Sequence, residues 1–257
     1  MKITFLGTGT SLGVPIIGCS CETCNSKDPR DKRLRTSCYV QTGDYHFLID
    51  IGPDFRQQML REKISKIDFV LITHEHNDHI AGIDDIRPFN FMQNQSINFY
   101  CNDRVYHDLI SKYDYIFKEN KYPGSPSINL KPILYDEAMY LEELNIVPIL
   151  LMHGKIDILG YRIGKMAYLT DISSISSEEL SKLQGIEVLI ISALRKESHH
   201  SHINLSQAID IYQSTSASRC YLIHLSHHYP CHEALQSELP SGVFAAYDGM
   251  SIGVTKM

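Results

Sequence analysis

The sequence lacks a long apolar run and a low-complexity linker. No stretch approaches the roughly 20 apolar residues that a bilayer-spanning helix needs, which argues against a membrane protein. The segment MKITFLGTGTSLG at residues 1–13 is too short in apolar length and too rich in glycine for a signal peptide. A cytoplasmic protein is therefore expected. Because no linker interrupts the chain, residues 1–257 are expected to form a single domain.

The sequence also lacks an excess of positive charge. Lys and Arg number 24 against 30 Asp and Glu, so the formal net charge is −6. Surfaces that bind nucleic acid broadly are usually basic, so this balance argues against such a partner. A local basic groove is still compatible with it.

The pattern of apolar residues predicts an α/β fold. The apolar runs are short and bounded by turn residues, and FVLIT (69–73) is continuous, as in a strand buried on both faces. A helix is predicted over 53–64, with Pro53 at its first position. Strands outnumber helices and helices occur in both halves, which favours two sheets inside and helices outside. Further strands are predicted at 2–7, 38–43, 45–52, 97–101, 145–153, 161–164, 166–171, 188–192, 220–226, 243–249 and 251–256, further helices at 79–86, 104–117, 177–183, 204–213 and 232–239, and a loop at 118–130.

The stretch THEHNDH at residues 73–79 concentrates metal-ligand side chains at the end of the buried run. His74 and His76 can point the same way on an extended loop, because side chains alternate with period two. Asp78 and His79 are adjacent and must point apart, toward a second position. Imidazole and carboxylate ligands suit Zn, Mn or Fe. The spacing therefore predicts two neighbouring metal ions.

A second cluster of ligand residues lies in IGCSCETCNS, which places Cys19, Cys21 and Cys24 at C-x-C-x-x-C. In a reducing compartment, clustered thiols more often hold metal than form disulfides. Three thiolates need a fourth ligand to complete a tetrahedral Zn site. From the residues alone, the candidates for this ligand are Cys38, His227, His228 and Cys231.

The motif THEHNDH resembles the signature of the metallo-β-lactamase superfamily of hydrolases. The resemblance implies a four-layer αβ/βα sandwich and three further ligands at strand ends. His153 ends NIVPILLMH, Asp171 ends MAYLTD and His224 lies in CYLIHLS, in the expected order. The resemblance implies that one ion is bound by His74, His76 and His153, that the other is bound by Asp78, His79 and His224, and that Asp171 bridges both.

Two further positions bear on this resemblance. Asp50 in FLIDIG matches a superfamily position from which it would orient a ligand histidine. Oxygen-reducing di-iron relatives have Glu where His76 stands, and Glu75 is one position too early, so the pattern favours a hydrolase. Two divalent ions, Mn or Zn, would supply an activated water near neutral pH.

Within the superfamily, GTGTSLGVPIIGCSCETC and HLSH resemble the PhnP family of phosphoribosyl cyclic phosphodiesterases. This resemblance implies that His227 completes one structural Zn site, which would tie the N-terminal loop to the strand that carries His224. It also implies a homodimer and a small phosphorylated substrate, 5-phosphoribosyl 1,2-cyclic phosphate, opened to ribose 1,5-bisphosphate.

The segment ESHHSHINLSQAI supplies a candidate acid. His202, just ahead of a predicted helix, aligns with the active-site histidine of the PhnP family and would protonate the leaving group. His199 and His200 rank below it. His202 and the ligand Asp78 are the catalytic candidates.

Other functions share the same metal core. An RNA-processing endonuclease similar to tRNase Z is one alternative, but the net charge and the lack of a clear basic arm argue against it. The metals alone are also compatible with lactam, thioester or lactone hydrolysis, which the cysteine cluster disfavours. A non-catalytic scaffold would not require an open dinuclear site. The ligands of the substrate phosphate are unassigned, and the surface charges considered for this role are Arg35, Arg87, Lys155 and Arg195.

Overall fold

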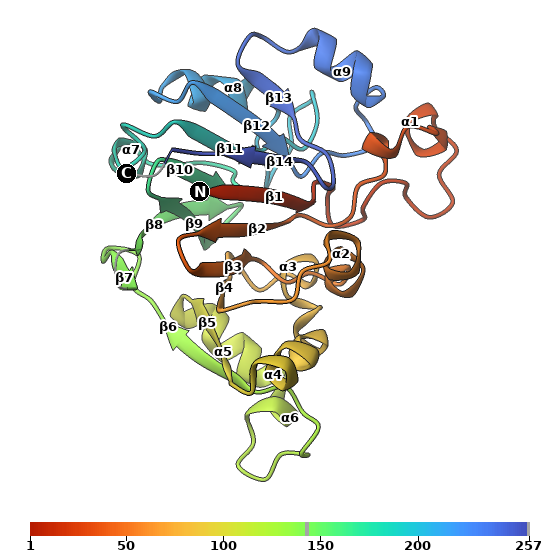
Figure 1. Cartoon of the computed structure of the whole chain (residues 1–257). Helices are drawn as coiled ribbons and strands as arrows, with labels where there is room; N and C mark the ends of the chain where they lie inside the picture. Colours follow the sequence, from red (N-terminus) through yellow and green to blue (C-terminus); the bar gives the residue numbers. More distant parts are fainter. Residues whose placement is uncertain (142–143, 256–257) are drawn as a thin grey trace.

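The computed structural model describes residues 1–141 and 144–255. Two mixed sheets face each other and helices cover their outer sides, as Figure 1 shows. The order of the layers is the αβ/βα sandwich predicted from the sequence.

Each sheet contains seven strands among the described residues, with antiparallel strands in one half and parallel strands in the other. In spatial order the first sheet contains β14 (Ser251–Gly253), β1 (Lys2–Gly7), β2 (Ser37–Thr42), β3 (Tyr45–Ile49), β4 (Phe69–Leu71), β5 (Ile97–Cys101) and β6 (Ile128–Pro132). The second contains β13 (Val243–Ala245), β12 (Arg219–Ile223), β11 (Val188–Ser192), β10 (Met166–Leu169), β9 (Ile156–Ile163), β8 (Leu144–His153) and β7 (Met139–Leu141).

Alternating side chains divide the core into three apolar layers. In β3, Phe47 and Ile49 belong to the cluster between the two sheets, whereas Leu48 joins the cluster under the helices of the first sheet. In β11, Ile190 faces the central cluster and Leu189 joins the cluster under the helices of the second sheet. Strands buried on both faces read as continuous apolar runs, which is why they were predictable from sequence.

Helices pack on the outer face of each sheet. The first sheet is covered by α2 (Phe55–Glu62), α4 (Arg87–Gln93) and α5 (Asp103–Lys112), and the second by α7 (Ser177–Ser181), α8 (Leu205–Gln213) and α9 (His232–Glu238). Shorter helices are α1 (Glu22–Asn25), α3 (Asn77–Ile80), α6 (Asp114–Phe117) and the 3₁₀ turns η1 (Pro29–Asp31) and η2 (Ile83–Ile86).

Some predicted boundaries were wrong. Helix α2 begins at Phe55, so Pro53 lies outside it; the Asp54 carboxylate accepts from the backbone N–H of Arg35 at 2.8 Å, which holds this turn out of the helix. The helix predicted over 104–117 breaks at Tyr113, between α5 and α6. The predicted loop at 118–130 contains the start of β6, and β7 was missed. Of the strand predicted at 251–256, β14 ends at Gly253, and residue 256 lies outside the described residues.

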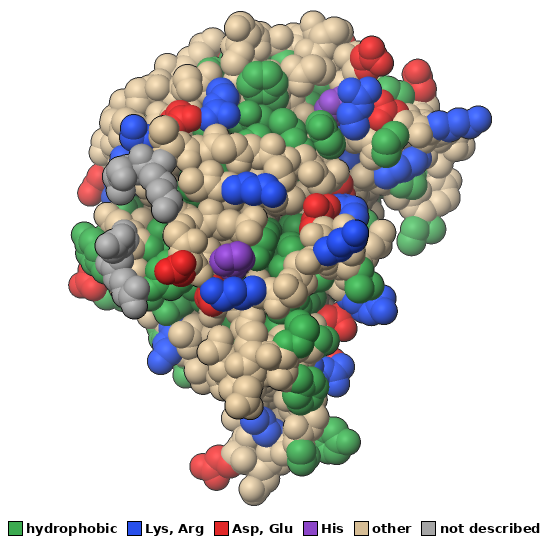
Figure 2. Space-filling model, viewed as in Figure 1, with side chains coloured by type: hydrophobic (Ala, Val, Ile, Leu, Met, Phe, Trp, Pro, Cys, Tyr) green, Lys and Arg blue, Asp and Glu red, His purple; other side chains and the backbone are tan. Residues whose placement is uncertain are grey.

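The surface carries interspersed charges of both signs. On the face seen in Figure 2, Lys and Arg side chains are mixed with Asp and Glu rather than gathered into one basic area. Among residues 1–141 and 144–255, no helix has the length and apolar character needed to cross a membrane.

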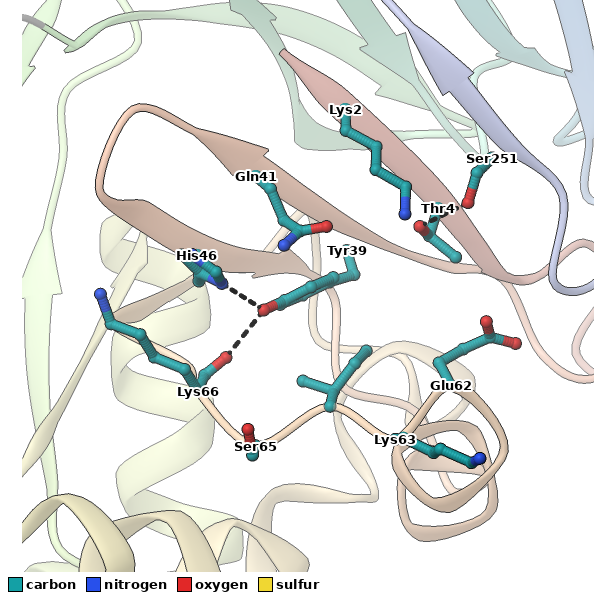
Figure 3. A pocket seen from close by; sticks show the side chains of 11 residues that line it. Lys2, Thr4, Tyr39, Gln41, His46, Glu62, Lys63, Ser65, Lys66 and Ser251 are labelled. Atoms are coloured by element: carbon teal, nitrogen blue, oxygen red, sulfur yellow. Dashed lines mark hydrogen bonds between the residues drawn. The ribbon is translucent and has the colours of Figure 1, made fainter.

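Function-related residues gather at one edge of the sheets. Asp50, His74, Asp171 and His224 each follow the carboxyl end of a strand, and His153 ends β8. A polar crevice of about 230 Å³ lies toward the other end of β3, where Lys2, Tyr39 and His46 are among its lining residues (Figure 3). In that crevice Tyr39 hydrogen bonds with His46 over 2.7 Å and donates to the carbonyl of Lys66, which ties β2 and β3 to the segment before β4.

Candidate metal centre

Seven ligand-type residues meet at the strand ends. Their ligand atoms form two groups, and within each group all the atoms lie within 4.8 Å of one another. The first group is His74, His76, His153 and Asp171, and the second is Asp78, His79, Asp171 and His224. The structure therefore brings together every residue that the sequence predicted for the two-ion site.

Asp171 belongs to both groups. Its Oδ2 lies 3.7 Å from Nε2 of His74 and 3.4 Å from Nε2 of His79, and its Oδ1 lies 3.3 Å from Nε2 of His224. Asp78 Oδ2 lies 3.2 Å from Nε2 of His79 and 3.7 Å from Nε2 of His224. A carboxylate with its two oxygens turned toward different imidazoles has the position that a bridging ligand needs.

The nitrogens that face this centre fit a metal. Nε2 of His74, His79 and His224 are buried, and none of them has a hydrogen-bond partner in the part of the chain that the structure describes. Leaving a buried polar group unpaired costs about 1–3 kcal/mol, so three such atoms around two carboxylates require an explanation. Divalent ions bound by imidazole and carboxylate would satisfy all of them.

The charges at the centre favour the same interpretation. Burial, and then the neighbouring His79, lower the pKa of His74 well below its ordinary value. Burial opposes the charged form of His79, but the carboxylates of Asp171 and Asp78 outweigh it and raise the pKa of His79 well above its ordinary value. Burial likewise acts against the ionised form of Asp171, yet His224 and His79 hold its pKa well below the usual range. The ionised carboxylates therefore require positive charge, which a proton or a metal can supply.

Asp50 holds two of the histidines in place. Its carboxylate accepts from Nδ1 of His79 at 2.7 Å, and from the N–H and the hydroxyl of Thr73 at 2.8 Å each. The Thr73 oxygen lies 3.0 Å from Nδ1 of His74. Because the hydroxyl donates to Asp50, its oxygen accepts from His74, which leaves Nε2 of both imidazoles for a metal. The predicted orienting contact of Asp50 with a ligand histidine is confirmed, and Thr73 was missed.

The backbone also positions this centre. His153 Nδ1 donates to the carbonyls of Asp171 (2.6 Å) and Ser201 (2.9 Å), which turns its other nitrogen toward the site. Asp50, Asp171 and His224 have φ angles of 65°, 58° and 55°, in the left-handed region that non-glycine residues rarely adopt. Such conformations cost energy and persist only where the surrounding structure imposes them. They cluster at functional sites.

His202 lies directly beside the two groups. Its ring centroid is 4.7 Å from that of His153 and 5.1 Å from that of His224, on which it stacks. Burial lowers the pKa of His202 to about 3, although Asp171 acts in the opposite direction. The ring centroid of His199 lies 5.3 Å from that of His202, and the ring centroid of His200 lies 4.3 Å from that of His199. Of the three histidines in this loop, His202 is the one whose ring contacts those of both His153 and His224.

The cysteine cluster forms a separate third group. Nδ1 of His227 lies 3.3, 3.5 and 3.7 Å from Sγ of Cys19, Cys21 and Cys24, respectively. Three thiols and one imidazole are the donor set of a structural Zn site. The backbone N–H of Cys24, with help from His227, lowers the pKa of Cys21 to about 6, which favours the thiolate that a metal needs.

The structure distinguishes the four candidates for the last ligand of this group. His227 is brought to the three cysteines, as the resemblance implied. Cys38 is buried between the two sheets, His228 contacts Ser226, and Cys231, at the N-cap position of α9, is not part of the group. Because His227 follows β12 and the cysteines lie just before and within α1, this group ties the N-terminal segment to the end of β12 in the second sheet.

Three of the four cations considered for phosphate binding make contacts with the protein, and the fourth, Lys155, is exposed. Arg35 pairs with Asp54 at 3.0 Å, Arg87 pairs with Asp84 at 2.6 Å, and Arg195 donates to the carbonyl of Ser198 at 2.8 Å. These contacts agree with their interpretation as surface charges.

The chain is similar to known proteins of one superfamily in both sequence and structure. The family model described as a beta-lactamase superfamily domain matches residues 45–225. A crystal structure described as a new diphosphatase from the PhnP family is 39% identical, with a TM-score of 0.91, and the match covers 98% of this chain and 96% of that one.

Two similar sequences have other names. An octanoyltransferase of Porphyromonas gingivalis is 40% identical over 252 residues, which are 97% of this chain but only 51% of that protein, so the chain spans about half the length of this relative. A ribonuclease Z of Borreliella afzelii is 26% identical over 301 residues, covering 89% of this chain and 94% of that protein. Since the family model matches most of the chain and the PhnP-family structure matches nearly all of it, the chain belongs to the metallo-β-lactamase superfamily and, within it, to the PhnP family.

Proposed function

We propose that the chain is a metal-dependent phosphodiesterase that hydrolyses a small phosphorylated molecule. The observation that carries this proposal is the pair of four-residue groups that share the carboxylate of Asp171. Two sites joined by one carboxylate suit a reaction in which charge develops on two neighbouring oxygens.

The three groups of neighbouring ligand atoms support the following assignment of metal ligands. One divalent ion, Mn or Zn, would be held by His74, His76, His153 and Asp171, a second by Asp78, His79, Asp171 and His224, and a structural Zn by Cys19, Cys21, Cys24 and His227. When bound, the first two ions would lower the pKa of a water molecule and stabilise negative charge around phosphorus.

The side chains have separate roles in this proposal. Asp50 fixes the orientation of His79, and the backbone carbonyls of Asp171 and Ser201 fix that of His153. His202, next to both groups, would donate the proton that a departing alkoxide needs once the negative charge of a bound phosphate raises its pKa, which burial alone lowers. Asp78 would be a ligand of the second ion, beside His79 and His224.

For the substrate we propose a cyclic phosphodiester, with 5-phosphoribosyl 1,2-cyclic phosphate as the specific candidate. Ring opening releases a sugar alkoxide, a poor leaving group that benefits from an acid such as His202. A second candidate is a diphosphate linkage, which the match to the diphosphatase of the PhnP family favours. Its leaving group is a phosphate, which departs with little need of a proton donor.

An RNA-processing nuclease is a third candidate, because the match to ribonuclease Z covers most of both chains. Against it stand the net charge of −6 and the mixed charges on the face shown in Figure 2. Affinity for an RNA backbone depends on the neutralisation of many phosphates by Lys and Arg side chains.

One experiment compares these candidates. The Mn- or Zn-loaded protein is assayed in parallel on 5-phosphoribosyl 1,2-cyclic phosphate, inorganic pyrophosphate, a nucleoside diphosphate, a precursor tRNA and a β-lactam. We expect turnover of the cyclic ester. Turnover of a diphosphate alone would replace the cyclic substrate by the second candidate, and turnover of the precursor tRNA alone would contradict the proposal of a small substrate.

A further inference from the structure

The residue between the two histidines of H-x-H points away from the metal centre. Side chains on an extended segment alternate, so Glu75 faces opposite to His74 and His76. Its side chain is 15% exposed and forms an ion pair with Arg104 on α5. The backbone carbonyl of Glu75 accepts from Nζ of Lys112 at 2.9 Å. Helix α5 therefore contacts this segment on the side away from the metal centre, through both the side chain and the backbone carbonyl of Glu75.

Arg104 also reaches the opposite sheet. While Nη1 donates to the Glu75 carboxylate, Nη2 donates to the carbonyl of Asp157 at 2.6 Å. Asp157 lies in β9 and pairs with Met152 of β8, next to His153. One guanidinium therefore joins the segment that carries His74 and His76 to the hairpin that carries His153.

These three imidazoles are the ones gathered in the first ligand group. His74 and His76 come from the first sheet and His153 from the second, so their spacing depends on how the two sheets are fixed to each other at this edge. The planar guanidinium has its donors in a rigid fork, which makes it suited to fixing two acceptors at once. The single ammonium of a lysine could not reproduce both contacts with the same geometry.

We propose that Arg104 is a positioning residue for the first metal ion, because it locks the H-x-H segment and the β8–β9 hairpin at the separation that His74, His76 and His153 need. In this role it acts through the carboxylate of Glu75 and the backbone of β9. The ion pair also keeps the carboxylate of Glu75 engaged on the side away from the ligands. This inference rests on the proposed function, since it assumes that the group binds a metal.

The test is metal affinity rather than activity. Zinc binding to metal-free wild type, R104A, R104K and E75A is titrated in competition with a chromophoric chelator, and the ions per chain are counted by native mass spectrometry. We expect R104A and E75A to lower the binding affinity of one of the two active-site ions about 10- to 100-fold, the range found when partners of metal ligands are removed. R104K should recover only part of the loss, and the zinc of the cysteine group should be retained in every variant.

The matched control is R87A, which removes an arginine of the same layer whose ion pair with Asp84 stays within one turn. Its metal affinities should equal those of wild type. The melting temperature of each metal-free variant is measured as well, because a purely structural role would lower it without a selective loss of one ion. Should R104A not fold, E75A removes the same contact from the loop side.

Two results would overturn the inference. One is that R104A and E75A bind each active-site ion with the same affinity as wild type. The other is an equal loss of affinity in R87A. If wild type binds only the zinc of the cysteine group, both the proposed function and this inference are wrong. The measurement on wild type alone identifies that case.

Discussion

His79 and Asp50 form a hydrogen bond of 2.7 Å between an imidazole Nδ1 and a carboxylate oxygen, and both side chains are fully buried. Asp50 adopts a φ of 65° directly after β3, and His79 lies in α3, 29 residues later. The bond decides which nitrogen of His79 faces Asp78 and Asp171. The geometry of the second ligand group therefore depends on a residue outside it.

Replacing Asp50 with Asn should weaken metal binding. The amide keeps the size of the side chain but removes the charge, and it can present an N–H instead of an acceptor to His79. Loss of such a partner typically costs 10- to 100-fold in metal affinity, and we expect a loss of that size. The measurement is a zinc titration of the metal-free protein against a competing chelator. Asp44→Asn, in an exposed turn, serves as the control. Unchanged affinity in Asp50→Asn would show that His79 is oriented without the carboxylate.

Replacing Cys21 with Ser should remove one zinc per chain while the two-ion site stays occupied. The hydroxyl of serine is a poor zinc ligand at neutral pH, and the three other members of the group cannot complete a tetrahedral site. Because metal binding stabilises the fold that forms the site, the melting temperature should also fall by several degrees. Zinc content and thermal unfolding are compared with Cys231→Ser, whose thiol lies outside the group. Equal zinc content in the two variants would contradict the structural site.

Replacing His202 with Ala should slow the release of alkoxides much more than that of good leaving groups. Loss of an acid typically costs about 10²- to 10⁴-fold in rate, and p-nitrophenolate needs little protonation. The kcat of the metal-loaded variant is measured on a ribosyl cyclic phosphate and on bis(p-nitrophenyl) phosphate. His200→Ala, at the exposed end of the same histidine-rich loop, is the control. Equal losses on both substrates would remove the acid role of His202.

Stability should depend on pH through a buried histidine that belongs to none of the three ligand groups. Nδ1 of His232 lies 3.3 Å from Nη2 of Arg33, and the His232 side chain is 4% exposed. Burial, and then the charges of Arg33 and Arg30, lower the pKa of His232 to about 4. The unfolded chain, with an ordinary histidine pKa of about 6.5, then binds more protons between these values, so stability falls as the pH drops through that range.

The expected size of this loss is about 1–2 kcal/mol between pH 7.5 and pH 5.0. Urea unfolding in constant excess zinc is compared for wild type and His232→Asn, in which an amide oxygen can still accept from Arg33. The wild type should lose more stability than the variant over this interval. The same loss in both would assign the acid sensitivity to other groups.

The candidate ligands of the H-x-H-x-D-H stretch could be named from the sequence because their residue types carry the chemistry, whereas His153, Asp171 and His224 were named from the resemblance. His74, His76, Asp78 and His79 lie within six positions after a buried strand, and few structural roles require such a set. The fold was predictable because strands buried on both faces are continuous apolar runs. The bonding of Asp50 to His79 was expected from the resemblance rather than from spacing.

Other features left no signal in the sequence. Thr73 and Arg104 are ordinary residue types, and their roles depend on tertiary contacts with residues that lie 23 to 53 positions away. The edge strands β6 and β7 are short and largely exposed, so they lack the apolar alternation that reveals a strand. The structural role of Gly52 could not be predicted from sequence either, although a Cβ there would lie 2.2 Å from the carbonyl oxygen of Asp78. The missing side chain of Gly52 lets the β3–α2 turn approach the ligand loop this closely.

The most direct test of the account is the position of bound metal around Asp171. Crystals of the metal-free protein are soaked in Mn²⁺, and anomalous diffraction data are collected at a wavelength where manganese scatters strongly. The account predicts two anomalous peaks, one on each side of the Asp171 carboxylate, the first in contact with His74, His76 and His153 and the second with Asp78, His79 and His224. Peaks that Asp171 does not touch, or no peak at this edge of the sheets, would contradict it.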